Sequence, residues 1–319
     1  PDEIVKYFGT SNIAGNECDI AYHATLMALL WDSIATHNCK VLTNGLQSMP
    51  FKVHGATWIN YVRCHDDIGL GYSDEDILRA GYNPHEHRKF IVKFFTGRFD
   101  GTFASGMPFM YNPKNGDARI SGSLASLAGL EKAIEEDDID KIDFAVKRIL
   151  LLHAIIISYG GIPMLYYGDE TGTENDYSFL QDDKTADDNR WLHRPKIDWK
   201  KQFENLKDER NPRAIIFKAL KKMIQTRKSS PEWADHNSCR ILDTGNDHVL
   251  AFERRLGDKV TLTLANFKDS DQWLPIDWVA ENRLNIDNLY DKYTEEHING
   301  ISGAVTLSPY QFMWVTEEY

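Results

Sequence analysis

The sequence has few of the features that mark secreted or membrane proteins. Its four cysteines, at positions 18, 39, 64 and 239, show neither paired nor metal-binding spacing. Cysteines of this kind favour free thiols, so we expect a reducing compartment, the cytoplasm. The longest apolar run, residues 149–157, is far shorter than the roughly 20 residues that a membrane-spanning helix needs. The first residues, Pro1-Asp2-Glu3, lack the basic and apolar regions of a signal peptide.

Positive charge is also scarce. Lys and Arg number 36 against 48 Asp and Glu, which gives a net charge of −12. Nucleic acids and anionic membranes carry phosphates that such a surface repels, so we expect neither as a partner. A neutral polar ligand fits better. With 42% hydrophobic residues, the 319-residue chain can bury one large core and a smaller second one.

Hydrophobic periodicity divides the chain into a helix-rich part and a strand-rich part. Apolar residues at helical spacing predict helices over 21–37, 74–80, 84–99, 138–159 and 212–228. Strands are predicted over 58–64 and from 161, so that a helix followed by a strand indicates a βαβ unit. The segment 101–122 is predicted to be ordered but irregular. From 239 onward short alternating runs predict a β-sandwich.

Two segments combine a buried-looking strand with charged residues at its C-terminal end. The segment 58–67 ends in His65, Asp66 and Asp67, and the segment 161–170 ends in two carboxylates. Barrel enzymes of the (β/α)₈ type carry their chemistry at the C-terminal ends of parallel strands. A carboxylate pair beside an imidazole can bind sugar hydroxyls through charge-assisted hydrogen bonds and stabilise an oxocarbenium-like transition state.

Two other interpretations of His65, Asp66 and Asp67 remain. Most triplets of this composition are a helix N-cap or a salt-bridged turn, and only the position at a strand end favours function here. A metal site is weaker, because one histidine and two carboxylates lack a second histidine. The sequence therefore predicts no metal.

Arg119 and Arg190 are further candidates, although arginines in such polar loops are often merely solvated or paired with a neighbour. Aromatic residues are plentiful around both in the sequence. Most of them belong to the core in a typical protein, yet sugar sites also use aromatic faces as platforms. The aromatic candidates are Phe103, Phe109, Tyr111, Tyr166, Tyr167, Phe179 and Trp191.

Five segments together resemble the α-amylase family of glycoside hydrolases, and within it the branch of amylosucrases and sucrose hydrolases. They are YVRCHDDIG at 61–69, GYNPHEHR at 81–88, NPKNGDAR at 112–119, GIPMLYYGDE at 161–170 and DDNRWLHRP at 187–195. The resemblance runs essentially from end to end. The His65-Asp66 pair and the GIPMLYYGDE strand are specific for the superfamily. The DDNRW segment points to the branch of amylosucrases and sucrose hydrolases.

The resemblance implies an α/β fold, the C-terminal half of a (β/α)₈ barrel with an inserted helical subdomain and an all-β C-terminal sandwich. Residues 1–67 are then the barrel portion leading into the seventh strand, and 68–136 the inserted subdomain. Residues 137–236 hold the eighth strand and the final helices, and 237–319 the C-terminal β-sandwich domain.

The activity that the resemblance implies is transfer of the glucosyl unit of sucrose to an α-1,4-glucan or to water by a retaining mechanism. His65 and Asp66 match the pair that binds and distorts the glucosyl ring, with Asp66 as transition-state stabiliser. Sucrose and α-glucans are the implied small-molecule partners, and no cofactor is implied.

The remaining matches concern the other end of the substrate. Asp67 and Arg119 match residues that hold the fructosyl or incoming sugar. Arg190 matches the arginine that closes the pocket floor by pairing with an upstream aspartate. Arg88 and Phe90 match more distant acceptor contacts.

Retaining glycosidases need a nucleophile and an acid/base, two carboxylates about 5 to 5.5 Å apart. In this family they lie at the ends of the fourth and fifth barrel strands, which the resemblance places upstream of this chain. We therefore expect this polypeptide to be incomplete and inactive alone. A half barrel also exposes apolar strand edges, so we expect the missing N-terminal half as a companion, or poor solubility.

Three departures from the family pattern bear on the acceptor: Cys64 stands where serine is usual, Leu70 where tryptophan is usual, and Ser105 where arginine is usual. The sequence leaves polymer synthesis and hydrolysis both open. It also leaves open a different α-amylase-type enzyme acting on starch or trehalose, and a non-catalytic sugar-binding relative.

Overall fold

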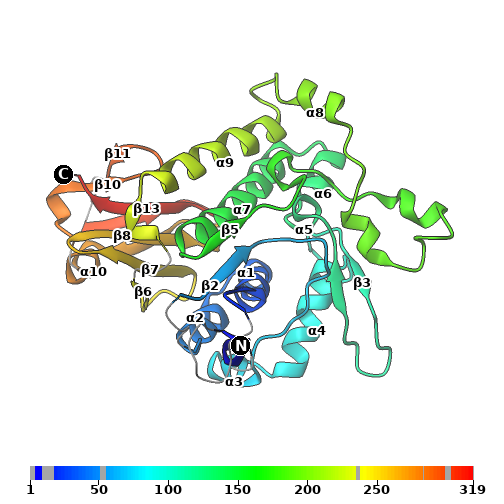
Figure 1. Ribbon diagram of the computed structural model, residues 1–319, viewed down its shortest axis with the longest axis horizontal. Helices are drawn as coiled ribbons and strands as arrows, with labels where there is room; N and C mark the ends of the chain where they lie inside the picture. Colours follow the sequence, from blue (N-terminus) through cyan, green and yellow to red (C-terminus); the bar gives the residue numbers. More distant parts are fainter. Residues whose placement is uncertain are drawn as a thin grey trace.

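The computed structural model describes residues 4–8, 18–50, 55–234, 238–282, 284–298 and 303–318. Figure 1 shows the strands β6 to β13 gathered with α10 at one end of the molecule, and β2 and β5 beside α1 and α7 in the centre. The helices are α1 (Ala24–Thr36), α2 (Lys40–Gln47), α3 (Asp74–Arg79), α4 (Pro84–Phe95), α5 (Leu124–Leu127), α6 (Leu130–Glu135), α7 (Ile139–Ser158), α8 (Trp199–Asn205), α9 (Pro212–Lys228) and α10 (Ile276–Glu281).

Three parallel strands form the first sheet, in the order β1 (Ile20–Tyr22), β2 (Thr57–Tyr61) and β5 (Ile162–Met164). The two outer strands have no second partner strand among the described residues. Three apolar side chains on them, Ile20, Tyr22 and Ile162, keep 45 to 49% of their surface exposed. Exposed apolar strands of this kind are what the half barrel predicts.

The strand β1 differs from the prediction, which placed residues 21 and 22 in a helix. In the structure Ala21 pairs with Trp58 and Tyr22 with Ile59, and the helix begins only at Ala24. The His23 side chain accepts a hydrogen bond from the Leu26 N–H and so caps α1. A strand of three residues is too short to show an alternating pattern beside a strong helical one.

The connection from β2 to α7 holds four helices, α3 to α6, and a small hairpin of β3 (Met107–Phe109) and β4 (Arg119–Ser121). The prediction of irregular structure over 101–122 is therefore wrong for these six residues. Each strand is only three residues long, and Pro108 within β3 hides its strand character from sequence patterns.

The C-terminal part is a sheet of six antiparallel strands in the order β11-β10-β13-β8-β7-β6, with a two-stranded sheet, β12-β9, beside it. These strands are β6 (Ser238–Leu242), β7 (Val249–Leu256), β8 (Lys259–Asn266), β9 (Gln272–Pro275), β10 (Leu289–Asp291), β11 (Glu296–His297), β12 (Ala304–Leu307) and β13 (Phe312–Glu317).

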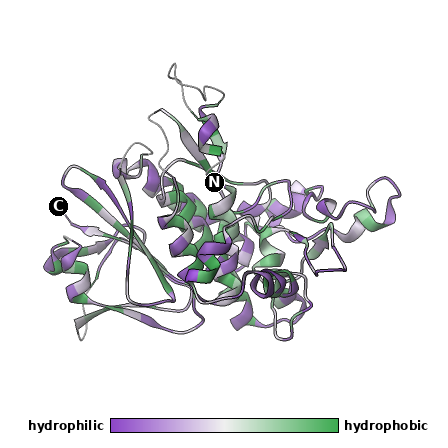
Figure 2. Cartoon of the chain, turned by 90° about the horizontal axis from the view of Figure 1, so that it is seen from below, coloured by the Kyte–Doolittle hydropathy of each residue, from purple (hydrophilic) through white to green (hydrophobic). Residues whose placement is uncertain are grey.

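Both faces of the larger sheet are buried. Along β7, Val249 and Ala251 join the sandwich core, whereas Leu250 and Phe252 join the main core around α7. Alternate residues of a strand point to opposite faces, so one strand serves two cores. Figure 2 shows the apolar residues concentrated where the helices meet this sheet. The predicted α/β class followed by a β-sandwich is thus confirmed. No helix in the described ranges is long and apolar enough to cross a membrane.

Candidate active site

A cleft of about 900 Å³ opens beyond the C-terminal end of β2. His65 and Asp66 lie on its wall, four and five residues after the strand ends at Tyr61. The His65 Nε2 atom is 3.4 Å from the Asp66 Oδ2 atom, and both side chains are more than half exposed. The structure therefore brings the predicted imidazole and carboxylate together, facing solvent in a cavity of a size typical of small-molecule sites.

Arg63 holds the turn that carries these two residues. It is buried, and its Nε donates to the Gly122 carbonyl and its Nη2 to the Asp66 carbonyl, both at 2.9 Å. These two bonds offset part of the cost of burying the guanidinium, although its Nη1 has no hydrogen-bond partner among the described residues. The backbone at Asp66 is thereby fixed to the chain that follows β4.

His193 and Arg194 hold the same turn from the other side. Arg194 Nε donates to the His65 carbonyl at 2.8 Å. Burial, reinforced by the charge of Arg63, lowers the pKa of His193 to about 2, so its ring is neutral. Its Nδ1 accepts from the Gly122 N–H at 3.2 Å, which leaves the proton on Nε2 to bond the His65 carbonyl at 3.1 Å.

Arg190 reaches the cleft from the short 3₁₀ segment Asn189–His193. Its Nη1 lies 3.8 Å from Asp66 Oδ1, so the third predicted residue joins the first two. Its main partner is Asp188, which it bonds in bidentate fashion at 2.8 Å on each oxygen. The upstream aspartate that the resemblance pairs with Arg190 is expected to lie outside this chain, and among the described residues Arg190 pairs with Asp188 and Asp66. This bonding to Arg190 lowers the pKa of Asp188.

Asp67 and Arg119 form the next part of the wall. Arg119 Nη1 donates to Asp67 Oδ2 at 3.3 Å, with the carboxylate 3% exposed and the arginine 58% exposed. The register of the small hairpin, in which Phe109 pairs with Arg119, sets this arginine at the rim. The predicted pair is therefore in contact, and it presents a guanidinium to the cleft.

Arg88 and Phe90 behave differently from each other. Arg88 lines the cleft, where its Nη2 donates to the Tyr72 carbonyl at 2.7 Å. Phe90 is not among the cleft-lining residues. It packs on Phe94 and Phe99, with ring centroids 5.8 and 5.0 Å away, because it lies two positions further along α4 and faces the core.

The aromatic wall of the cleft is not the one that the sequence suggested. Its rings are Tyr22, Tyr61 and Tyr72, of which the first two meet edge to face at 5.5 Å. None of the seven predicted aromatic residues lines the cleft, although Phe109 stacks under Arg190 at 5.0 Å. Tyr61 could have been found from its place in the predicted strand that ends at the site, whereas Tyr22 could not, because β1 carries no sequence signal.

The carboxylates at the end of β5 do not join the cleft either. Asp169 is buried, and burial raises its pKa well above the usual value, with Arg63 acting in the opposite direction. Glu170 accepts from the Gly168 N–H at 2.8 Å. Neither lines the cleft, and of the two only Glu170 makes a side-chain hydrogen bond within the loop that follows β5.

One group of side chains has the donor types of a metal site. The ligand atoms of Cys64, His65 and Asp66 lie within 4.8 Å of one another. Arg190 and Arg194 each place a guanidinium nitrogen 3.7 to 3.8 Å from Asp66. Because these charges oppose a divalent cation, the arrangement fits an uncharged hydroxylated ligand better than a metal.

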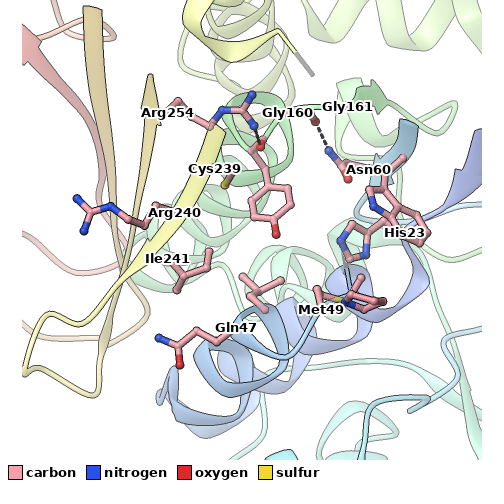
Figure 3. A pocket seen from close by; sticks show the side chains of 14 residues that line it. His23, Gln47, Met49, Asn60, Gly160, Gly161, Cys239, Arg240, Ile241 and Arg254 are labelled. Atoms are coloured by element: carbon pink, nitrogen blue, oxygen red, sulfur yellow. Dashed lines mark hydrogen bonds between the residues drawn. The ribbon is translucent and has the colours of Figure 1, made fainter. Parts of the chain in front are cut away.

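A second cavity, of about 390 Å³, lies between the parallel sheet, α2 and β6 (Figure 3). No carboxylate occurs among the described residues that line it. Burial lowers the pKa of His23, on its wall, to about 3, and Arg254 is occupied by the carbonyls of Tyr159 and Ala234. Without an acid or base, this cavity offers no chemistry for a glycosidic bond.

Residues 239–314 match the family model described as maltogenic amylase, C-terminal domain. The chain is 26% identical over 316 residues to glucosylglycerate phosphorylase of Escherichia coli K12, covering 98% of this chain and 50% of that protein. It is 22% identical to trehalose synthase/amylase TreS of Mycobacterium tuberculosis, covering 98% and 49%. The chain thus spans about half the length of the curated relatives it matches.

Solved structures show the same architecture. AmyP in complex with maltotriose superposes with a TM-score of 0.60 at 12% identity, covering 98% of this chain and 52% of that one. Sucrose 6F-phosphate phosphorylase from Thermoanaerobacter thermosaccharolyticum gives 0.56 at 16% identity, covering 78% and 43%. The chain therefore shares the fold of these solved structures, and residues 239–314 are similar to the C-terminal domain of maltogenic amylase.

Proposed function

We propose that the cleft binds the glucosyl ring of an α-glucoside and that this chain supplies the sugar-binding half of an α-amylase-type glucosyltransferase or hydrolase. The observation that carries the proposal is the convergence of three predicted residues, with His65 3.4 Å and Arg190 3.8 Å from Asp66. Charge-assisted hydrogen bonds from such groups to sugar hydroxyls are about twice as strong as neutral ones.

Each residue then has a role in a retaining reaction. Asp66 stabilises the positive charge that develops on the glucosyl ring, and His65 donates a hydrogen bond to a ring hydroxyl. Arg190, held by Asp188, closes the floor. Arg119, paired with Asp67, and Arg88 contact the leaving or incoming sugar.

The nucleophile and the acid/base are not assigned to this chain. Asp67 is buried and bonded to Arg119, and Asp66 faces two arginines. We therefore do not assign Asp66 and Asp67 as the nucleophile and the acid/base. We propose that a companion N-terminal half, docked on the exposed edges of β1 and β5, supplies both acids. The reaction needs no cofactor, because the two carboxylates carry the covalent chemistry.

For the substrate we propose sucrose, with transfer to an α-1,4-glucan or to water, on the strength of the motifs at 61–69 and 187–195. The second candidate is trehalose, which the similarity to trehalose synthase/amylase favours. Glucosylglycerate, which appears in the name of the relative from Escherichia coli, carries a glucosyl group as sucrose and trehalose do. We also propose a cytoplasmic location, because all four cysteines are free thiols.

Titration of the chain with sucrose, trehalose and maltose by calorimetry tests the binding. Asp66→Asn should lower the affinity for the sugar about 10- to 100-fold. The substitution removes an ionic hydrogen-bond partner that contributes roughly 1.5–3 kcal/mol to binding. His65→Ala should cost about fivefold, because one neutral hydrogen bond is lost.

The matched control is His297→Ala. His297 lies 3.0 Å from Glu318 in the C-terminal sheet, with 57% exposure against 61% for His65. Its loss should leave sugar affinity unchanged. Equal affinity of wild type and Asp66→Asn would refute the assignment.

Mixing the chain with its N-terminal half and measuring fructose release from sucrose tests the enzymatic proposal. Turnover only in the mixture agrees with it, and turnover by this chain alone contradicts it. Sugar binding without turnover in the mixture would favour a non-catalytic relative.

A further inference from the structure

Asp32, in the middle of α1, is a carboxylate buried with no surface exposed. It does not line the cleft, and no lysine or arginine lies within ion-pair distance of it in the described part of the chain. A carboxylate is costly to bury unless hydrogen bonds compensate for the lost water. Its position therefore calls for specific partners.

Two side chains from the inserted subdomain meet at one of its oxygens. The Tyr72 hydroxyl donates to Asp32 Oδ2 at 2.5 Å, and the His87 Nε2 lies 2.5 Å from the same atom. The His87 ring is also stacked on Tyr82, with centroids 4.9 Å apart. Asp32 thus ties two separate elements, the loop before α3 and the helix α4, to the barrel helix α1.

The same two elements hold Arg88 on the cleft wall, together with Asp74 at the start of α3, whose Oδ1 accepts from Arg88 Nη1 at 2.5 Å. Arg88 follows His87 on α4, and its Nη2 donates to the carbonyl of Tyr72 at 2.7 Å. Its Nε donates to the Leu70 carbonyl at 3.3 Å, and its guanidinium lies 5.6 Å from the centre of the Tyr72 ring. The direction of this guanidinium depends on how the loop of Leu70 and Tyr72, with the following α3, is placed relative to α4.

We propose that Asp32 is a positioning residue that holds Arg88 and Tyr72 in register on the acceptor side of the cleft. This inference rests on the proposed function, because it concerns how firmly one wall of the sugar site is fixed. Asp32 touches neither the cleft nor Arg88. It acts through the Tyr72 hydroxyl and the His87 ring, and both groups point away from the cavity toward α1.

Sugar affinity of point variants is the first test, with maltose as the probe. Tyr72→Phe removes only the buried hydroxyl and keeps the ring beside Arg88, and Asp32→Asn removes the charge that both donors share. Each should weaken maltose binding about 3- to 10-fold. In an Arg88→Ala background the same changes should cost nothing further, since residues that act as one unit are not additive.

Glu232→Gln is the matched control for a buried acid. Glu232 is 1% exposed and accepts from Thr261 at 2.7 Å and from Lys292, away from the cleft. This change should lower thermal stability as much as Asp32→Asn does but leave maltose affinity unchanged. Equal weakening by Glu232→Gln would show a merely structural effect and overturn the proposal.

Hydrogen exchange of the free chain gives a second readout that needs no sugar. The amides of residues 69–74 should exchange at least fivefold faster in Tyr72→Phe and Asp32→Asn than in wild type or Glu232→Gln. Unchanged exchange there overturns the inference even if the cleft binds maltose. Faster exchange in these variants of a chain that binds no sugar would support the positioning role of Asp32. The same result would refute the proposed function.

Discussion

Mild acid should destabilise this chain, because three histidines are buried in the neutral form. Burial lowers the pKa of His23 to about 3, of His153 to about 4 and of His193 to about 2, from an ordinary 6.5. Below pH 6.5 the unfolded chain binds protons at these positions and the folded chain does not. Stability is therefore fully present above that pH and is lost as the pH falls.

The size of the effect follows from the same values. Between about pH 7 and about pH 5.5, each unfolded-state histidine gains roughly 1.2 kcal/mol from protonation, while none of the three titrates in the folded state. Together they should lower the free energy of unfolding by about 4 kcal/mol. The buried carboxyls of Asp169 and Glu131, whose pKa values are raised by burial, act in the opposite direction, so this figure is the contribution of the three histidines alone.

Urea unfolding followed by tryptophan fluorescence at both pH values measures this loss. His153→Leu provides the control. His153 is buried in α7, and its described partner is the Ile149 carbonyl, 2.8 Å from Nδ1. Its replacement should reduce the pH-dependent loss by about 1.2 kcal/mol. Equal stability at the two pH values, or an unchanged loss in the variant, would refute the reasoning.

Two further substitutions test the site and the fold. Arg194→Gln removes the 2.8 Å bond to the His65 carbonyl and should weaken sugar binding about 3- to 10-fold, as measured by calorimetry. Gly161→Ala should cost about 2 kcal/mol or more in urea unfolding, because Gly161 has φ of +66° and an added Cβ would meet the Trp58 carbonyl. Gly257→Ala, with φ of +57° but open space around it, should cost only about 1 kcal/mol.

Long periodic segments made most of the fold predictable. The helix α7 begins after Asp138, whose carboxylate accepts from the Lys141 N–H, and the helix α9 begins at Pro212 after the cap Asn211. Both signals are local and can be read from sequence. Short elements such as β1 carry no such signal, because only their parallel neighbour defines them.

The candidate site was predictable where chemistry followed a strand end, as at His65 and Asp66. The side chains that hold the turn of these two residues in place could not be predicted. The contacts of His193 and Arg194 with the His65 carbonyl join positions 128 and 129 residues apart, and no local pattern announces them. For Phe90 the motif match was misleading. It predicted an acceptor contact, but the position of Phe90 on α4 directs its side chain toward the core.

Nuclear magnetic resonance of the His65 ring is the most direct test of the central claim. Its imidazole signals, assigned by comparison with His65→Ala, should shift as sucrose or maltose is added, and those of His297 should not. The shifts should saturate, and in Asp66→Asn they should need about 10- to 100-fold more sugar to reach the same size. Signals of His65 that stay unmoved at saturating sugar would contradict the account.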